Sequence, residues 1–261
     1  MLTAIIVAAG SSQRMGFDKL FATIAGKPLI AHTLHAFERA SSVNEIIVVA
    51  REDRHGEIRK ISRAENFKRI HSIIEGGERR QDSVRAGLHQ LSAATKYVAV
   101  HDAARPLITP EQIERVFEQC LIHGAAALAE PINDTLKRAD VDPLGSRSHH
   151  GGKADQVLAV AGSVDRHRLY AMQTPQVFER ALIETAYRAA HTENVSLTDE
   201  VSAVERLGRT VVLVLNDDFN FKITYQRDLA LAEFLLKQRR APAANGRARP
   251  PGAPRKTDHG N

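Results

Sequence analysis

The sequence predicts an α/β protein in which a mostly parallel sheet is covered by helices on both faces. Apolar runs rich in β-branched residues occur at residues 5–9, 45–50 and 70–74, and segments of helical periodicity separate them. Each run reads as continuous rather than alternating, with Glu45, His71 and Ser72 as the polar members, which is typical of parallel strands buried on both faces. The alternation of strand and helix therefore indicates one large α/β domain.

Helical spacing of apolar residues recurs along most of the chain. Pro28 is expected to open the first helix, and Pro175 is expected to interrupt the chain as a turn former. Thr198 is expected to cap a helix that ends at Gly208. The predicted helices cover residues 28–39, 54–65, 81 onward, 110–123, 180–190, 196–208 and 226–237, and the further strands cover residues 97–100, 125–129 and 210–215.

Composition excludes several classes of protein. The chain contains no Trp and a single cysteine, Cys120, so no internal disulfide can form. No apolar run approaches the roughly 18 residues of a membrane span. The N-terminus lacks the basic and cleavable segments of a signal peptide. These features predict a cytoplasmic protein that does not enter a membrane.

The net charge of +5 comes from the C-terminal tail rather than from the domain. Of 36 cationic and 31 anionic residues, six and one lie in residues 239–261, which leaves 30 of each sign in residues 1–238. The tail is rich in Pro, Gly and Ala, so we predict a domain at 1–238 and a disordered extension at 239–261. The balanced domain gives no reason to expect specific binding of nucleic acid.

The stretch from Ile5 to Lys19 indicates a phosphate site. Its strand ends in Gly10 and two serines, and such small residues let backbone N–H groups approach a phosphate. Arg14 and Lys19 add positive charge at the same edge of the sheet. The stretch lacks the Gly-Lys-Ser/Thr of a P-loop and the three glycines of a dinucleotide fingerprint. A plain turn with two solvated cations is the alternative.

Two further segments follow predicted strands at the same edge. Gly76 precedes a helix whose first turn holds Asp82 and Ser83, where free N–H groups are either capped or contact a base or ribose. Asp102 and Arg105 follow the next strand. Asp102 can organise a metal, a ribose or a lysine, and Arg105 can pair with it as a structural ion pair. Both structural and functional interpretations stay open for these residues.

The alternation fails between residues 133 and 164. This segment holds DTLKR, a patch rich in Gly, Ser and His, and an alternating strand-like run, so we predict an extended arm of two strands joined by a long loop. His149 and His150 lack the spacing of metal ligands on a helix and are interpreted as loop residues. Exposed strand edges need a cover, and the same arm of a second copy would supply one, which predicts a homodimer.

Motifs in order along the chain resemble one family. They are AAGSSQRMG, HTL, EGGERRQDSV, HDAARP, NDTLKRA, VDRHRLY, TPQVF, LTDEVSAVE and FKIT. By these motifs the chain is identified as a member of the 2-C-methyl-D-erythritol 4-phosphate cytidylyltransferases, within the Rossmann-like nucleotidyltransferases. The resemblance covers nearly all of residues 3–236. The chain departs from the family at Ser12, where a glycine is usual, and at Asp18-Lys19-Leu20, where Pro-Lys-Gln is usual.

The resemblance implies in-line transfer of a cytidylyl group from CTP to methylerythritol phosphate, with Mg²⁺ held mainly by the CTP phosphates and Asp102 considered as a ligand. Such a reaction asks the protein for alignment and charge stabilisation. The implied nucleotide-binding residues are Ala8, Ala9, Gly10, Gly76, Asp82 and Ser83, and the implied catalytic residues are Arg14, Lys19, Arg166 and Lys222. The implied acceptor-binding residues are Asp102, Arg105, Thr135, Lys137, Arg166, Thr174, Thr198 and Lys222, those of the arm reaching a second subunit.

Two alternative functions stay open at this point. One is cytidylyl transfer to a different polyol phosphate, such as ribitol 5-phosphate. The other is a catalytically silent protein with a nucleotide-binding or regulatory role. The presence of Arg14, Lys19, Arg166 and Lys222 together argues against the silent protein.

Overall fold

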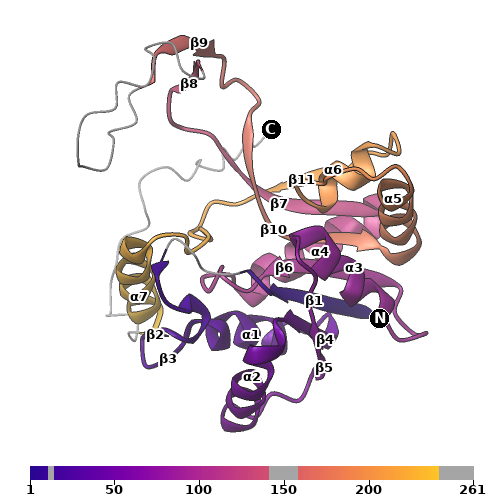
Figure 1. The fold of residues 1–261 in the computed structure, drawn as a ribbon, viewed down its shortest axis with the longest axis vertical. Coiled ribbons are helices and arrows are strands. Elements are labelled where there is room, and N and C mark those ends of the chain that lie inside the picture. The colour runs from indigo at the N-terminus through magenta and orange to yellow at the C-terminus, as the bar shows by residue number, and fades with distance from the viewer. Residues whose placement is uncertain (11–14, 141–157, 241–261) are drawn as a thin grey trace, which may run out of the picture.

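A computed structural model describes residues 1–10, 15–140 and 158–240. Its centre is a seven-stranded sheet in the order β11-β7-β10-β6-β1-β4-β5 (Figure 1). Neighbouring strands are parallel except where β10 meets β6 and β7. The strands are β1 (Leu2–Ala8), β4 (Val43–Ala50), β5 (Ile70–Glu75), β6 (Tyr97–Asp102), β7 (Ala125–Pro131), β10 (Tyr170–Glu179) and β11 (Val212–Leu215). The prediction of a mostly parallel sheet is confirmed.

Helices cover both faces of the sheet because the side chains of each strand point alternately to either side. On β1, Ala4 and Ile6 belong to one hydrophobic core and Ile5 to the other. The first core includes α1 (Leu29–Arg39), α2 (Glu52–Ala64), α4 (Pro110–His123) and α7 (Gln226–Arg240). The second includes α3 (Arg80–His89), α5 (Arg180–Thr192) and α6 (Glu200–Glu205). No helix in the described part of the chain is long and apolar enough to cross a membrane.

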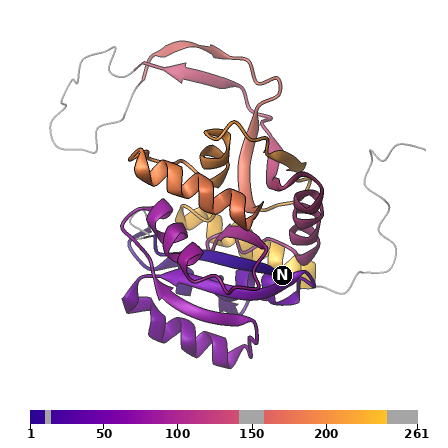
Figure 2. The same ribbon diagram turned by 90° about the vertical axis from the view of Figure 1, so that its right-hand side faces the viewer.

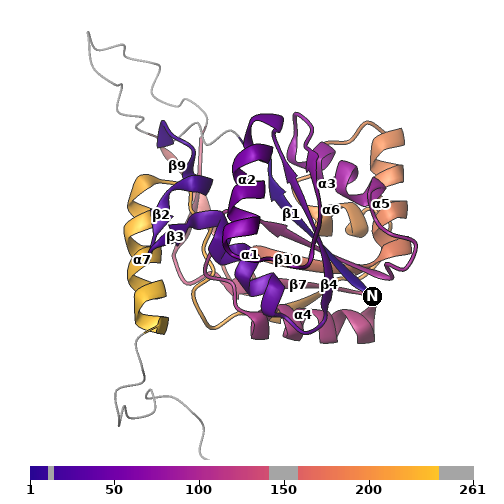
Figure 3. The same ribbon diagram turned by 90° about the horizontal axis from the view of Figure 1, so that it is seen from below.

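A short segment between β1 and α1 has structure that the sequence analysis did not predict. It contains the 3₁₀ turn η2 (Lys19–Phe21) and a hairpin of β2 (Thr23–Ile24) and β3 (Lys27–Pro28). Ala25 and Gly26 both have positive φ, as a two-residue hairpin turn favours. Figure 3 shows α7 beside this hairpin, and α7 contacts β2. The C-terminal helix and the segment after β1 therefore lie together.

The predicted arm is present. Its strands, β8 (Leu136–Ala139) and β9 (Val160–Val164), pair antiparallel with each other. Figures 1 and 2 show the arm standing away from the body, joined to it by the ends of β7 and β10. His149 and His150 lie outside the described residues.

The prediction that Pro175 forms a turn is wrong. β10 runs through Pro175, and its pairing with β7 stops at Met172 and resumes at Gln176 after a shift of register. Its pairing with β6 begins at Gln176. Pro175 thus lies where no ladder hydrogen bond is required of it, which is how a strand accommodates proline.

The prediction that Thr198 caps the sixth helix is also wrong. Asp199, not Thr198, caps α6, because its carboxylate accepts from the Ser202 N–H at 2.9 Å while Ser202 Oγ accepts from the Asp199 N–H at 3.3 Å. This reciprocal pair selects Asp199 over its neighbour. Gly208, with φ of +67°, follows the helix as predicted.

The C-terminal helix ends later than predicted. Helix α7, predicted to end at 237, continues to Arg240 and so passes the predicted domain boundary at 238. The Arg239 guanidinium donates to the Leu107 carbonyl at 2.6 Å and to Asp218 Oδ2 at 2.6 Å, so it belongs to the domain. The predicted disorder of residues 241–261 concerns a segment outside the described residues.

Candidate active site

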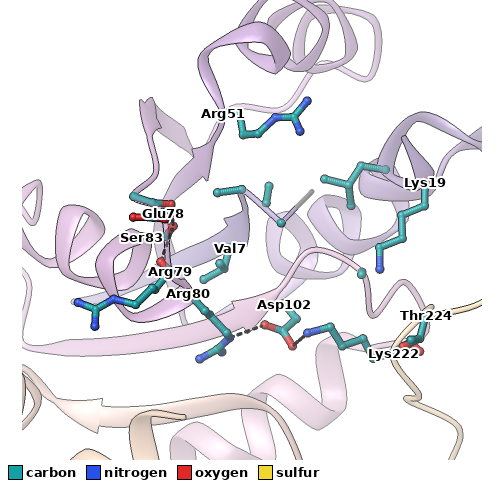
Figure 4. A pocket seen from close by; sticks show the side chains of 16 residues that line it. Val7, Lys19, Arg51, Glu78, Arg79, Arg80, Ser83, Asp102, Lys222 and Thr224 are labelled. Atoms are coloured by element: carbon teal, nitrogen blue, oxygen red, sulfur yellow. Dashed lines mark hydrogen bonds and ion pairs between the residues drawn. The ribbon is translucent and has the colours of Figure 1, made fainter. Parts of the chain in front are cut away.

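The carboxyl ends of β1 and β6 open into a cavity of about 680 Å³ (Figure 4). The segments after β4, β5 and β11, the start of α3 and η2 complete its wall. Its described lining carries five cationic side chains, on Lys19, Arg51, Arg79, Arg80 and Lys222, and two anionic ones, on Glu78 and Asp102. This excess of positive charge suits the binding of a polyphosphate.

Small residues form the part of the wall where β1 ends. Ala8, Ala9 and Gly10 line the cavity, as does the buried Ser83 at the start of α3. Gly76 fits behind them because a Cβ there would lie 2.6 Å from Ala9 Cβ and 2.7 Å from Ser83 Oγ. A flat ring can therefore approach the backbone closely at this point.

Asp82 lies elsewhere. Together with Gly76 it borders a second cavity, between α3 and α5, rather than the first. Its carboxylate accepts from Nε of Arg79 at 2.9 Å and from Nη2 of Arg79 at 3.0 Å, and also from the Arg79 N–H at 3.3 Å. Asp82 thus holds the start of α3, which is the structural alternative that the sequence left open.

Asp102 is the centre of the charged part of the cavity. It ends β6 and is buried, with Oδ1 3.0 Å from Arg80 Nε and Oδ2 2.9 Å from Lys222 Nζ (Figure 4). Burial alone would raise the pKa of this carboxyl, but the charges of Arg80, Lys222 and Arg105 hold it well below its ordinary value. Asp102 is therefore ionised and fixes two cations beside the cavity.

A second, deeper carboxylate fixes Arg80. This carboxylate is that of Glu200, which is fully buried. Nη1 and Nη2 of Arg80 donate to Oε1 and Oε2 of Glu200 at 2.7 and 3.0 Å. The Tyr187 hydroxyl donates to Glu200 Oε1 at 2.9 Å. Burial tends to lower the pKa of Arg80, and the charges of Glu200 and Asp102 outweigh it and raise the pKa. Arg80 is thus a cation held by a fork of two carboxylates.

Lys222 reaches the cavity from a segment that is itself anchored. The Ile223 N–H donates to the Ala104 carbonyl at 2.8 Å. The Asn220 amide donates to the Thr174 carbonyl at 2.9 Å. Lys19 Nζ donates to the Ile223 carbonyl at 2.6 Å. Figure 4 shows Lys19 and Lys222 on the same side of the cavity as Thr224. Two lysines far apart in the sequence therefore lie at one site.

The structure brings several predicted residues to the cavity and gives others supporting positions. Arg105 is largely buried and donates to the Asn220 carbonyl at 2.7 Å, and its Nε lies 3.9 Å from Asp102 Oδ2, so the ion pair that the sequence left as one alternative is present. Thr174 is buried, and its Oγ1 accepts from the Asp102 N–H at 3.1 Å. Thr198 is exposed. None of these three lines the described wall of the cavity.

The predicted residues of the arm lie apart from this cavity. Thr135 and Lys137 are exposed, and Lys137 Nζ donates to Ser163 Oγ across the arm at 2.6 Å. Arg166, also exposed, donates to the Asn133 carbonyl at the base of the arm. None of them lines the described wall of the cavity in their own chain. Arg14 lies outside the described residues.

Sequence reasoning missed Arg80 and Glu200. A signal existed for Arg80, because it follows two glycines and precedes a helix at the predicted carboxyl edge of the sheet. Nothing local marked Glu200, an acidic residue in the first turn of a helix, as a buried partner of that arginine. Its burial depends on a pairing that spans 120 positions.

The described residues do not form a metal cage. No group of three or more His, Cys, Asp or Glu side chains is placed to hold a metal in the described part of the chain. Both carboxylate oxygens of Asp102 are engaged by cations. This donor set does not fit a divalent cation held by the protein alone, whereas Mg²⁺ commonly arrives with substrate phosphates.

Comparison with known proteins gives one consistent answer. Residues 2–238 match the family model of 2-C-methyl-D-erythritol 4-phosphate cytidylyltransferase (IspD). The enzyme of that name from Dehalococcoides mccartyi strain CBDB1 is 38% identical over 238 residues, which cover 91% of this chain and 96% of the relative. The relative of the same name from Halalkalibacterium halodurans is 37% identical over 239 residues, which cover 91% and 97%.

Solved structures agree. The structure of 2-C-methyl-D-erythritol 4-phosphate cytidylyltransferase from Thermus thermophilus matches with a TM-score of 0.69 and 31% identity, covering 91% of this chain and all of that one. The structure of 4-diphosphocytidyl-2C-methyl-D-erythritol synthase from Anaerococcus prevotii matches with a TM-score of 0.75 and 27% identity, covering 91% and 98%.

Proposed function

The chain belongs to the 2-C-methyl-D-erythritol 4-phosphate cytidylyltransferase family, and we propose that the cavity between β1, α3 and β6 is where it carries out that family's reaction. The protein is a nucleotidyltransferase that transfers a cytidylyl group from CTP to 2-C-methyl-D-erythritol 4-phosphate in isoprenoid biosynthesis. One observation carries the assignment of the site. Lys19, Arg80 and Lys222 come from three distant segments and lie with Asp102 on the wall of one cavity.

Each part of CTP has a suitable part of the wall. The cytosine fits against the backbone of Ala8, Ala9 and Gly10, with Ser83 beside it, since this region lacks bulky side chains. The triphosphate lies toward Lys19, and Arg14 supplies a second cation. Lysine and arginine both bind phosphate oxygens well, as a point charge and as a planar fork.

The acceptor phosphate lies toward Lys222 and Arg80. One of its oxygens forms a new bond to the α-phosphorus of CTP while the bond from that phosphorus to the bridging oxygen of the β-phosphate breaks, and pyrophosphate leaves. A phosphate monoester with a second pKa near about 6 is mostly dianionic at neutral pH, so no side chain need remove a proton. The fixed cations align the reactants and stabilise the charge of the transition state.

Asp102 serves this arrangement as an anchor. By pairing with Lys222 and Arg80 it keeps both cations at the cavity wall when no substrate is bound. Mg²⁺ would be held by the CTP phosphates rather than by a protein cage, and it would neutralise charge on the pyrophosphate that leaves. The engagement of both Asp102 oxygens supports this division of roles.

The functional unit is a homodimer in the cytoplasm, with Thr135, Lys137 and Arg166 reaching the acceptor at the cavity of the partner. The exposure of these residues and the projection of the arm from the body support this arrangement (Figure 1). Thr174 and Thr198 contribute from the same chain, Thr174 by supporting the Asp102 backbone.

Pyrophosphate release tests the proposal. The purified protein is mixed with CTP and Mg²⁺ and with a panel of acceptors that includes methylerythritol phosphate, ribitol 5-phosphate and unphosphorylated methylerythritol. We expect release with methylerythritol phosphate and loss of it when EDTA is added. A higher kcat/KM with ribitol 5-phosphate would assign a different acceptor to the cavity. No release with any acceptor would indicate a silent nucleotide-binding protein.

A further inference from the structure

We propose that Arg54 and Asp18 are positioning residues, which hold Lys19 in register with the end of β1 for the transfer reaction. Neither side chain lines the described wall of the cavity. The inference rests on the proposed function, since it takes Lys19 as a contact of the CTP phosphates. It concerns which residues place that lysine.

Arg54 is an unusual residue for its position. It lies in the first turn of α2, and its side chain is only 2% exposed. A guanidinium taken out of water needs hydrogen-bonding partners, or its burial is strongly unfavourable. Arg54 has two. Its Nε donates to Asp18 Oδ2 at 2.6 Å, and its Nη1 donates to the Ala8 carbonyl.

These two partners lie at the two ends of one segment. Ala8 is the last residue of β1 and lines the cavity, and Asp18 directly precedes Lys19. A single planar guanidinium thus sets the separation between the end of the strand and the turn that carries the lysine. Arginine suits this task because its donors form a rigid fork.

Asp18 passes the constraint on to Lys19. While Oδ2 accepts from Arg54, Oδ1 accepts from the Leu20 N–H at 3.2 Å and caps the η2 turn. Lys19 begins that turn, and its Nζ reaches the Ile223 carbonyl, next to Lys222. A continuous chain of contacts therefore runs from α2 to the two lysines of the cavity.

The pair contributes position more than stability. A buried ion pair is often replaceable by apolar side chains at little cost in stability, because desolvation offsets most of the attraction. Lysine, by contrast, is a flexible side chain whose reach depends on where its backbone lies. A displacement of about 1 Å in a group that aligns reactants can lower a rate by roughly 100-fold.

Two substitutions test the role. Asp18→Asn keeps the shape and removes the charge, and Arg54→Met keeps the stem and removes the guanidinium. Glu57→Gln is the matched control, since Glu57 belongs to an exposed pair with Lys60 on the same helix. For each variant we measure kcat, the KM for CTP, the number of CTP sites per chain by calorimetry, and the melting temperature.

We expect both substitutions to lower kcat/KM for CTP by roughly 10- to 100-fold while one CTP site per chain is retained and the control stays at the wild-type value. Wild-type kinetics in both variants would overturn the inference. So would a loss of activity in a folded variant that matches its loss of CTP sites, because the substitution would then remove binding rather than shift Lys19. If a single variant does not fold, the double variant Asp18→Asn/Arg54→Met, which leaves no unpaired charge, replaces it.

A double-mutant cycle with Lys19→Ala separates this inference from the proposed function. If Asp18 acts through Lys19, then adding Asp18→Asn to Lys19→Ala lowers kcat/KM by much less than it does in the wild type. Effects that multiply in full would show that Asp18 acts independently and would overturn the inference. Failure of the wild-type protein to turn over CTP with methylerythritol phosphate would instead overturn the proposed function itself.

Discussion

The charged residues of the cavity and those of the arm are arranged in opposite ways. Arg80 and Asp102 at the cavity are largely withdrawn from water and pair with each other, and Arg80 also pairs with the buried Glu200. Lys137 and Arg166 on the arm are exposed, and their recorded contacts lie within the arm and its base. The body thus fixes the charged groups of its cavity through buried partners, whereas the arm leaves its charges in solvent.

This difference affects how each region should respond to mutation. Removing one partner of a buried pair leaves an uncompensated charge and costs stability. Removing an exposed charge costs little stability, because solvent already screens it. Changes at the cavity should therefore combine effects on activity and stability, and changes on the arm should affect activity alone.

The largest expected effect is that of Lys222→Ala on turnover. Lys222 is partly exposed at the cavity, and Asp102 still pairs with Arg80 when Lys222 is lost, so the variant should fold, at some cost in stability. Loss of a cation that stabilises the transition state should lower kcat by about 100-fold. Lys237→Ala on α7, which breaks an exposed pair with Glu233, is the control and should keep wild-type turnover. Near-normal kcat in Lys222→Ala would place the acceptor elsewhere.

The next effect sharpens the comparison through stability. Glu200→Gln removes the fully buried carboxylate that holds the half-buried Arg80 and should lower the free energy of unfolding by about 3 kcal/mol. Glu193→Gln removes an exposed partner of Arg206 and should change the free energy of unfolding by less than about 1 kcal/mol. Urea unfolding of both variants checks this. Equal effects would mean that burial does not distinguish the two pairs.

The arm is tested by mixing two inactive variants. In a dimer that shares sites, a mixture of Lys222→Ala and Thr135→Ala forms heterodimers in which one site carries both defects and the other neither. Random exchange of subunits should then restore about a quarter of the sites. Thr135→Ala alone should keep the wild-type melting temperature. Light scattering that finds a monomer, or confirmed heterodimers without activity, would confine the site to one chain.

A smaller effect concerns acid. Burial lowers the pKa of His101, which directly precedes Asp102, to about 3. In the unfolded chain the same imidazole would become protonated at about pH 6.5. Stability contributed by the neutral, buried imidazole is therefore present above about pH 6.5 and is lost as the pH falls toward 3. The lowered pKa of Asp102 acts in the same direction at lower pH.

We expect the melting temperature of the wild type to fall between about pH 7 and pH 5, and His101→Gln to reduce that slope. His167→Gln on the segment after the arm changes an exposed histidine and should leave the slope unchanged. An equal change of slope in both variants would refute a special contribution from the buried ring.

The smallest effect is expected from the tail. Ending the chain after Arg240 removes residues 241–261, whose composition cannot bury enough apolar area to offset ordering, so stability and turnover should stay at wild-type values. Ending it after Gln238 also removes Arg239 and its hydrogen bonds to Leu107 and Asp218, and should cost about 1 kcal/mol. A large loss of melting temperature in the first truncation would contradict this expectation.

Local patterns were reliable where a segment's environment is uniform along its length. The apolar strands, the helix Pro110–His123 and the break that marks the arm could all be predicted because their burial or exposure follows from their own composition. The patterns failed where a choice between neighbours depends on a distant partner. Thr198 and Asp199 are both good caps, and Pro175 reads as a turn until the shift in the β7 ladder accommodates it.

The sequence by itself determined the order of the main strands and helices and the edge of the sheet where the cavity opens, and it named Lys19, Asp102 and Lys222, which line that cavity. Only the tertiary structure decided that Glu200 fixes Arg80, that Arg54 reaches Asp18, and that the arm residues lie away from the cavity of their own chain. The physical reason is that a buried charge is tolerated only beside its partner. Such partners lie 36 or 120 positions apart here, beyond the reach of any local pattern.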